Sequence, residues 1–196
     1  MSSRQAQRSD TTRRELLSVA RGLFTDEGFA SATLDDVVER AGVTKGALYH
    51  HFRDKKELFR AVFEELEMEM CNEIIAAAAT AGDDVLEQMR RGVQAFLAAA
   101  ADPAKQRICL VDGPSVLGWE TWREIDEQYG YGLTKGILQA AMDAGVIKQR
   151  PVEPLAHIML AALSEAAIQV ARSEDPKKAT EDMSSTLWAL LDSLRT

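Results

Sequence analysis

Cysteine and proline are scarce in this chain. Its 196 residues include two cysteines, Cys71 and Cys109, and five prolines. Two cysteines are too few for a disulfide framework or for a zinc site built on thiolates, which excludes the disulfide-rich secreted class. We expect both to be small buried residues of a cytoplasmic protein.

Long hydrophobic runs are missing as well. Residues 74–79 form one of the longest apolar runs, far short of the roughly 20 residues that cross a bilayer. The first ten residues are polar and lack the apolar segment of a secretory signal. The sequence therefore predicts neither secretion nor contact with a membrane.

Negative charge is in excess, but it is unevenly distributed. The net charge is −8, from 23 Lys and Arg against 31 Asp and Glu. Residues 1–60 hold 11 basic and 9 acidic side chains, whereas residues 61–196 hold 12 and 22. An acidic body with a basic N-terminal part attracts a polyanion only at that part.

Strand-like alternation of apolar and polar residues is absent, and the apolar spacing is helical throughout. We predict an all-α protein of about nine helices, the first of which begins near Asp10 with Thr12 and Glu15 at capping-box spacing. Gly130 and Gly132 should interrupt one of the later helices. The expected helices are 10–27, 34–40, 44–51, 54–82, 84–101, short pieces within 103–118, 119–144, 154–172 and 176–194.

Two short helices joined by a glycine turn stand out in residues 33–52. Gly42 allows a left-handed backbone that joins the two helices at a steep angle. The second helix has Leu48 and Phe52 as core contacts and leaves Lys45 and Tyr49 outward. This pattern is typical of a helix-turn-helix that enters the DNA major groove, although many all-α proteins also join short helices through glycine.

A longer stretch, residues 13–59, resembles the DNA-binding domain of TetR-type transcriptional regulators. The resemblance rests on Leu23-Phe24 with Gly28-Phe29, Thr33, residues 41–46 (AGVTKG), residues 48–52 (LYHHF), Lys55 and Glu57-Leu58. It implies a three-helix DNA-binding domain at 1–54 and a larger helical domain for ligand binding and dimerisation at 55–196. It also implies a homodimeric repressor that a small-molecule effector releases from a pseudo-palindromic operator. Control by a protein partner is the alternative.

The resemblance also implies which residues contact DNA. Lys45 can donate to guanine, Ala47 offers a methyl group to thymine, and Tyr49 matches a phosphate contact. Asp35 and Asp36 depart from the family's pattern, because many members have a basic or polar residue there. The expected DNA-binding residues are Thr33, Thr44, Lys45, Gly46, Ala47, Tyr49, His50 and Lys55.

The second domain should hold an effector site and a dimer interface. An apolar cavity with a few convergent polar groups suits a small molecule, and the candidates are Phe96, Asp112, Trp119, Trp122, Arg123, Tyr129, His157 and Gln169. The last two helices are expected to form a homodimer through a face of small residues at positions 161, 162, 166, 167 and 171. Alternatively, that face closes the core of the protomer.

An enzyme is disfavoured. His50 and His51 lie in the DNA-reading segment, and His157 stands alone. The chain has no metal-ligand spacing, no glycine-rich phosphate loop after a strand and no serine elbow. We therefore expect no catalytic residue, no metal site and no cofactor.

Overall fold

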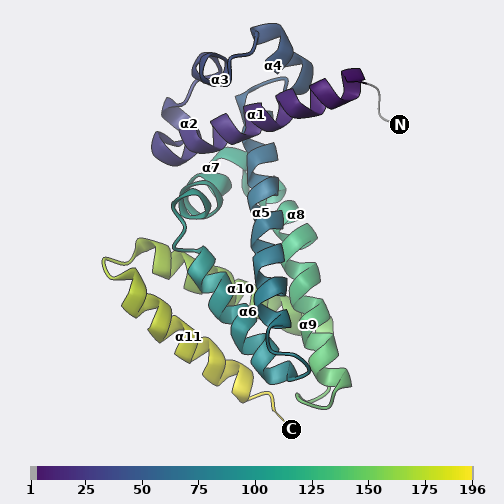
Figure 1. Ribbon diagram of the computed structural model, residues 1–196. Coiled ribbons are helices and arrows are strands. Elements are labelled where there is room, and N and C mark those ends of the chain that lie inside the picture. The colour runs from purple at the N-terminus through teal and green to yellow at the C-terminus, as the bar shows by residue number, and fades with distance from the viewer. Residues whose placement is uncertain (1–3, 196) are drawn as a thin grey trace.

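The computed structural model describes residues 4–195, and the regular elements of this part of the chain are all helices, apart from one isolated bridge between Ile147 and Arg195. The all-α prediction is confirmed. Four helices form a head at one end, and the long helix α5 runs from the head to the far end of the body (Figure 1). The head contains α1 (Arg4–Asp26), α2 (Gly28–Ser31), α3 (Leu34–Ala41) and α4 (Lys45–His51).

The first helix begins at Arg4, six residues before the predicted start. The capping box predicted at Thr12 and Glu15 is wrong, because both residues lie inside α1. Residues 4–9 (RQAQRS) are mostly good helix formers, so nothing in them stops the helix from extending toward the N-terminus. Polar residues at capping spacing mark a helix start only where the preceding residues cannot continue the helix.

The boundaries of α3 and α4 follow the predicted local signals. The hydroxyl of Thr33 accepts from the Asp36 amide, and the Asp36 carboxylate accepts from the Thr33 amide, which completes a capping box. Gly42 ends α3 with a φ of +64°, in the left-handed region. Thr44 caps α4 by accepting from the Ala47 amide. These three residues fix the steep turn that holds α4 against the head.

The core of the head is built on aromatic rings and continues into the body. Phe59, on α5 (Lys55–Ala79), packs edge-on against Phe24 and Phe29, with ring centroids 5.2 and 5.1 Å away. The same buried cluster includes Ile108 and Ile125, which lie far along the chain. Packing therefore continues across residue 54, where the sequence places a domain boundary.

The body consists of the rest of α5 and the helices that follow it. Its elements are α6 (Val85–Ala99), the π-helical segment η1 (Lys105–Asp112), α7 (Gly113–Leu117), α8 (Trp119–Asp126), the π-helical segment η2 (Glu127–Tyr131), α9 (Gly132–Asp143), α10 (Val152–Arg172) and α11 (Pro176–Asp192). The interruption expected at Gly130 and Gly132 is the π-helical turn η2 rather than a break. The elements exceed the predicted nine because α2 lies where no helix is predicted, and because residues 103–118 and 119–144 each contain more than one element.

Helix α10 packs against the rest of the body partly through small residues, whereas α11 buries Leu187 and Leu191. Ala166 and Ala167 are buried, and Ala166 belongs to one cluster with Leu97, Val170 and Leu187. Ala162 packs against that cluster. Ala166 and Ala167 therefore help to close the core of the protomer, as the alternative expects, whereas Ala161 on the same helix is exposed.

By length and composition alone, α10 could cross a membrane, although the sequence shows no continuous apolar run of that length. Within the protomer it packs against α6, α9 and α11, as a core helix of the body does. Only 33% of its most apolar stretch is buried, and Ile158 is 66% exposed. A large part of this apolar helix is thus left uncovered by its own chain.

Candidate nucleic-acid interface and ligand cavity

Helix α4 has one buried and one exposed side. Leu48 is fully buried in the core of the head, whereas Tyr49 is 56% exposed. The other residues predicted on this face, Lys45, Gly46 and His50, are exposed, and Ala47 is half-buried. The hydroxyl oxygen of Thr44 accepts the capping bond, which leaves its hydrogen available to a base or phosphate. The exposed side of α4 therefore combines a cation, a small side chain and two hydrogen-bonding rings.

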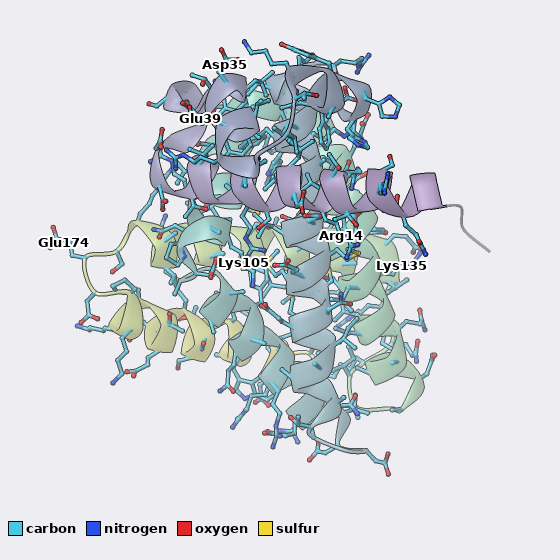
Figure 2. The ribbon with its side chains drawn as sticks, turned by 45° about the horizontal axis from the view of Figure 1, so that its top comes forward. Arg14, Asp35, Glu39, Lys105, Lys135 and Glu174 are labelled. Atoms are coloured by element: carbon cyan, nitrogen blue, oxygen red, sulfur yellow. The ribbon has the colours of Figure 1, made fainter. Side chains whose placement is uncertain are left out.

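Lys45 is held by an ion pair to α3. Its Nζ lies 2.8 Å from Oδ1 and 2.9 Å from Oδ2 of Asp35. The hydrogen bond to Asp35 raises the pKa of Lys45, and the charge of that carboxylate adds to the effect. Figure 2 shows Asp35 at the outer edge of the head. A ligand that recruits Lys45 must compete with Asp35, and the negative charge of Asp35 lies on the same surface.

Thr33 and His50, two of the predicted DNA contacts, also interact with neighbouring residues of the chain. The Thr33 hydroxyl donates to Asp36 Oδ2 at 2.6 Å, so its hydrogen is already used in the capping box. The rings of His50 and His51 meet edge to face, with centroids 5.1 Å apart. Burial lowers the pKa of His51, and the neighbouring His50 and Arg13 lower it further. His50 is exposed and free to approach a phosphate.

Lys55 is directed inward. Its Nζ donates to the carbonyls of Phe29 at 2.7 Å and Ala32 at 2.9 Å, and more weakly to that of Ala30 at 3.4 Å. It also lies 4.4 Å from the centroid of the Phe29 ring. An ammonium has three N–H donors, and three carbonyls occupy them. The geometry favours a structural role for Lys55, which closes the end of α2, over the predicted phosphate contact.

A polar groove next to α4 gathers basic side chains outside the set of expected DNA-binding residues. It runs between the head and the start of α5, and its basic lining residues are Arg13, His51, Arg53, Lys56 and Arg60. Arg53 and Arg60 also pair with Glu57 and Glu64 at i,i+4 spacing. These positions are separated by up to 47 places in the sequence, so only the folded chain shows that they share one groove.

The body encloses a cavity lined by α5, α6, α8, η2, α9, α10 and α11. The cavity has a volume of about 90 Å³, which is several times the roughly 10–15 Å³ that one water molecule needs. Most of the lining is aliphatic or methionine. Of the predicted effector residues, Phe96 lines this cavity.

The other seven predicted effector residues lie outside that lining. Trp119 is 66% exposed and its ring packs on Trp122, and Tyr131 stacks on His157 with centroids 4.4 Å apart. Gln169 donates to Glu165 on the outer side of α10. Arg123 pairs with Glu127 and approaches Asp126, Tyr129 packs on the core that the head and body share, and Asp112 contacts the head.

Two carboxyl groups that the sequence did not mark line the cavity. Glu67 on α5 is 6% exposed, and Asp126 at the end of α8 is 9% exposed. Burial raises the pKa of Glu67 to about 8, and the charge of Asp126 adds to the increase. Burial also raises the pKa of Asp126 to about 6, against the opposing effect of Arg123. In the sequence both resemble the many carboxylates of solvated helix faces.

The segment η1 joins the cavity to the head. Cys109 is buried on η1 and donates its thiol hydrogen toward Glu67. At the end of η1, Asp112 Oδ2 accepts from the Phe29 amide of α2 at 2.9 Å and from Arg107 at 3.3 Å. Lys105, at the start of η1, is buried and pairs with Glu73 of α5, below the head in Figure 2. A change at the cavity wall therefore has a packed route to α2.

The comparisons with known proteins cover both parts of the chain. Residues 16–62 match the family model of bacterial regulatory proteins of the tetR family, and residues 86–194 match that of the tetracyclin repressor-like C-terminal domain. A crystal structure of a TetR-family transcriptional regulator from Pectobacterium atrosepticum is 32% identical, with a TM-score of 0.84, and the match covers 100% of this chain and 98% of that one.

Two curated relatives agree with these matches. The transposon Tn10 TetC protein of Escherichia coli is 26% identical over 79% of this chain and 78% of its own length. The HTH-type transcriptional regulator AcrR of Shigella flexneri is 40% identical over 76 residues, which is 35% of each chain. Among residues 4–195, no group of three His, Cys, Asp or Glu side chains converges as a metal site would require. A head with an exposed helix-turn-helix, a helical body and matches over nearly the whole chain lead to one conclusion: the chain belongs to the TetR family of non-enzymatic, DNA-binding transcriptional regulators.

Proposed function

We propose that the protein is a homodimeric repressor that a small molecule, bound in the cavity of the body, releases from a pseudo-palindromic operator in the cytoplasm. The observation that carries the proposal is the exposed side of α4, which presents Lys45, Tyr49 and His50 away from the core. Each head then reads one half-site in the major groove.

The contacts divide into base reading and phosphate holding. Lys45 donates to guanine O6 or N7 after leaving Asp35, and the methyl group of Ala47 faces a thymine. Tyr49, His50 and the basic groove around Arg13 and Lys56 bind phosphates. Thr44 and Gly46 lie at the start of α4, where the backbone approaches the DNA most closely. Thr33 contributes its position at the start of α3 rather than a free hydroxyl.

Effector control uses the route through η1. A molecule that displaces the carboxyl of Glu67 also disturbs the thiol of Cys109 and, through η1, the bond between Asp112 and the Phe29 amide. Because α2 packs directly against α1 and η1, a shift of η1 tilts the head. The effector changes DNA binding only by its difference in affinity for the two arrangements, typically 1–3 kcal/mol in such systems.

The proposed dimer forms through the outer faces of α10 and α11. The exposed apolar residues Ile158 on α10 and Leu190 on α11, 66% and 50% exposed, support this surface. Ala162 and Ala166 face inward and do not serve as the contact. Ile158→Glu should sediment as a folded monomer, whereas Lys178→Glu, at the exposed start of α11, should sediment as a dimer. A dimeric Ile158→Glu variant would place the contact elsewhere.

Selection of bound sequences from a random DNA pool tests the function. The proposal predicts a palindrome with half-sites about 10 base pairs apart or a multiple of that spacing. Recovery of no common sequence, with affinity that depends only on salt, would refute operator recognition. A melting temperature that no small molecule raises, together with a partner protein that displaces the DNA, would favour control by a protein.

A further inference from the structure

The chemistry of the cavity wall restricts the class of effector, and this inference rests on the proposed function of the cavity. Asp126 Oδ2 is buried and has no hydrogen-bond partner in the described chain. The nearest cation is Nη1 of Arg123 at 3.7 Å, beyond hydrogen-bonding distance, and the Nε of the same side chain is directed to Glu127 at 3.3 Å. A buried carboxylate oxygen without a donor is unfavourable, and a ligand that brings a donor removes that penalty.

The charges around the carboxyl groups of Glu67 and Asp126 favour a cationic ligand beside them. Glu67 faces Asp126, the thiols of Cys71 and Cys109, and the phenol of Tyr129. Arg123 and Glu127 face Asp126 from the other side. The lining residues include no Lys, Arg or His, so a carboxylate or phosphate ligand would find no counter-ion among them. An anionic ligand would add charge of the same sign to an acidic site.

The rest of the lining is suited to an apolar body. Ile74, Val93, Phe96, Leu138 and Leu163 line the remaining wall from four different helices. Gly130, on η2, lets the wall close tightly at the acidic end. A Cβ atom at Gly130 would lie 3.1 Å from Leu160 Cδ1 and 3.4 Å from Asp126 Oδ1. A π-helical turn at such a position is a frequent mark of a functional site.

We infer that the effector is a small hydrophobic amine, whose single protonated nitrogen donates to Asp126 Oδ2 and to Glu67 while its apolar part fills the cavity beside Phe96. Charge-assisted hydrogen bonds are about twice as strong as neutral ones, so the cavity distinguishes an ammonium from an alcohol of the same shape. A divalent metal is a poor alternative, because no set of three His, Cys, Asp or Glu ligands converges within residues 4–195.

The probes are 2-phenylethylammonium, 2-phenylethanol and 3-phenylpropionate, titrated calorimetrically into the intact protein at pH 7.5. We expect the ammonium to bind at least about tenfold more tightly than the alcohol, and the carboxylate more weakly than both. Asp126→Asn should reduce the preference for the ammonium to about twofold or less, and Glu124→Gln, at an exposed position of the same helix, should retain it. Circular dichroism confirms that both variants fold.

The pH dependence gives a second readout. The amine stays protonated from pH 5 to 7, whereas Asp126, with a pKa near 6, becomes ionised over this range. Binding of a cation favours the carboxylate and releases its proton, so the affinity should rise roughly tenfold from pH 5 to 7 in the wild type. In Asp126→Asn it should change little. An affinity for the ammonium that is independent of pH overturns the assignment.

The operator is titrated in the same samples, which separates this inference from the proposed function. A preference for the ammonium that depends on Asp126 supports the ligand class even if operator affinity stays constant, and that constancy would argue against ligand control. Equal binding of the ammonium and the alcohol, or tighter binding of the carboxylate, overturns the ligand class and leaves the repressor proposal standing. An ammonium that fails to bind up to its solubility limit also overturns it.

Discussion

The head and the body of this protein differ in how completely their side chains are satisfied. In the head, Leu16, Phe24 and Leu48 are fully buried, and the starts of α3 and α4 carry side-chain caps. In the body, a cavity remains open, Asp126 has a buried oxygen without a partner, and two π-helical segments interrupt the regular helices. This contrast fits a DNA-binding head of fixed shape and, under the proposed function, a body that keeps space for a ligand.

The largest expected difference concerns two phenylalanines. Phe59 is fully buried in the aromatic cluster of the head, so Phe59→Ala should lower the free energy of unfolding by about 3–5 kcal/mol. Phe96 is half-buried beside a space that already exists, so Phe96→Ala should lower it by only about 1 kcal/mol. Urea denaturation of both variants measures the two values. Equal losses would mean that the body is packed as tightly as the head.

The pH dependence of stability should have opposite signs in the two regions. The raised pKa values of Asp126, about 6, and Glu67, about 8, mean that the folded body retains protons which the unfolded chain releases. Stability should therefore fall by several kcal/mol as pH rises from about 4 to 8. The lowered pKa of His51 works the other way, because the folded head then binds fewer protons and gains stability as pH rises through its range.

The double variant Glu67→Gln, Asp126→Asn isolates the contribution of the body. Its stability should depend much less on pH between 4 and 8, and it should unfold at higher urea than the wild type at pH 8. A pH profile that the double substitution leaves unchanged would show that these carboxyls are solvated. His51→Gln should remove only the opposite slope near pH 6.

Substitutions of Lys45 and Lys55 should separate an effect on DNA binding from an effect on stability. Lys55→Ala leaves the carbonyls at the end of α2 without their donor, and we expect a loss of about 2 kcal/mol of stability. Lys45→Ala removes an exposed ion pair, for which about 0–1 kcal/mol is typical. Thermal denaturation ranks the two variants. A stable Lys55→Ala protein with uniformly weaker DNA binding would restore the predicted phosphate contact.

Small effects of opposite sign are expected at two glycines, Gly28 and Gly22. Gly28 has a φ of +77°, and a Cβ atom there would collide with the Arg107 guanidinium. Gly28→Ala should therefore lower stability by roughly 1–2 kcal/mol and loosen the contact with η1. Gly22 lies exposed within α1 with open space around it, so Gly22→Ala should raise stability by roughly 0.5–1 kcal/mol. If Gly28→Ala and Gly22→Ala changed the free energy of unfolding in the same direction, this account of the turn at Gly28 would be contradicted.

The sequence predicts the head better than the body for a physical reason. Thr33, Gly42 and Thr44 act through bonds to residues at most a few positions away, so local patterns suffice to place α3 and α4. The start of α1 was missed because its N-terminal residues continue a helix without any stop signal. The glycines at 130 and 132 predict an interruption, but its π-helical form goes with the close approach of Leu160, which lies 30 positions along the chain.

The candidate sites show the same division. The exposed side of α4 follows from the helical spacing around Leu48. Of the predicted effector residues, only Phe96 lines the cavity, because large aromatic residues of the body serve equally in stacked surface pairs such as Trp119 with Trp122. Glu67 and Asp126 are separated by 59 positions, and in the sequence they look like solvated charges, whereas the folded body buries both. The inward direction of Lys55 likewise depends on the carbonyl groups of α2.

The most direct test of the account is the operator dissociation constant of two single variants, Lys45→Ala and Asp35→Ala, measured by fluorescence anisotropy on the selected operator. If Lys45 reads a base, Lys45→Ala should weaken binding by about 1–3 kcal/mol and relax the preference at one base pair. Asp35→Ala should tighten binding, because it frees Lys45 and removes a negative charge from the DNA-facing surface. If both variants weaken binding equally, or neither changes it, the exposed side of α4 is not the surface that reads the operator.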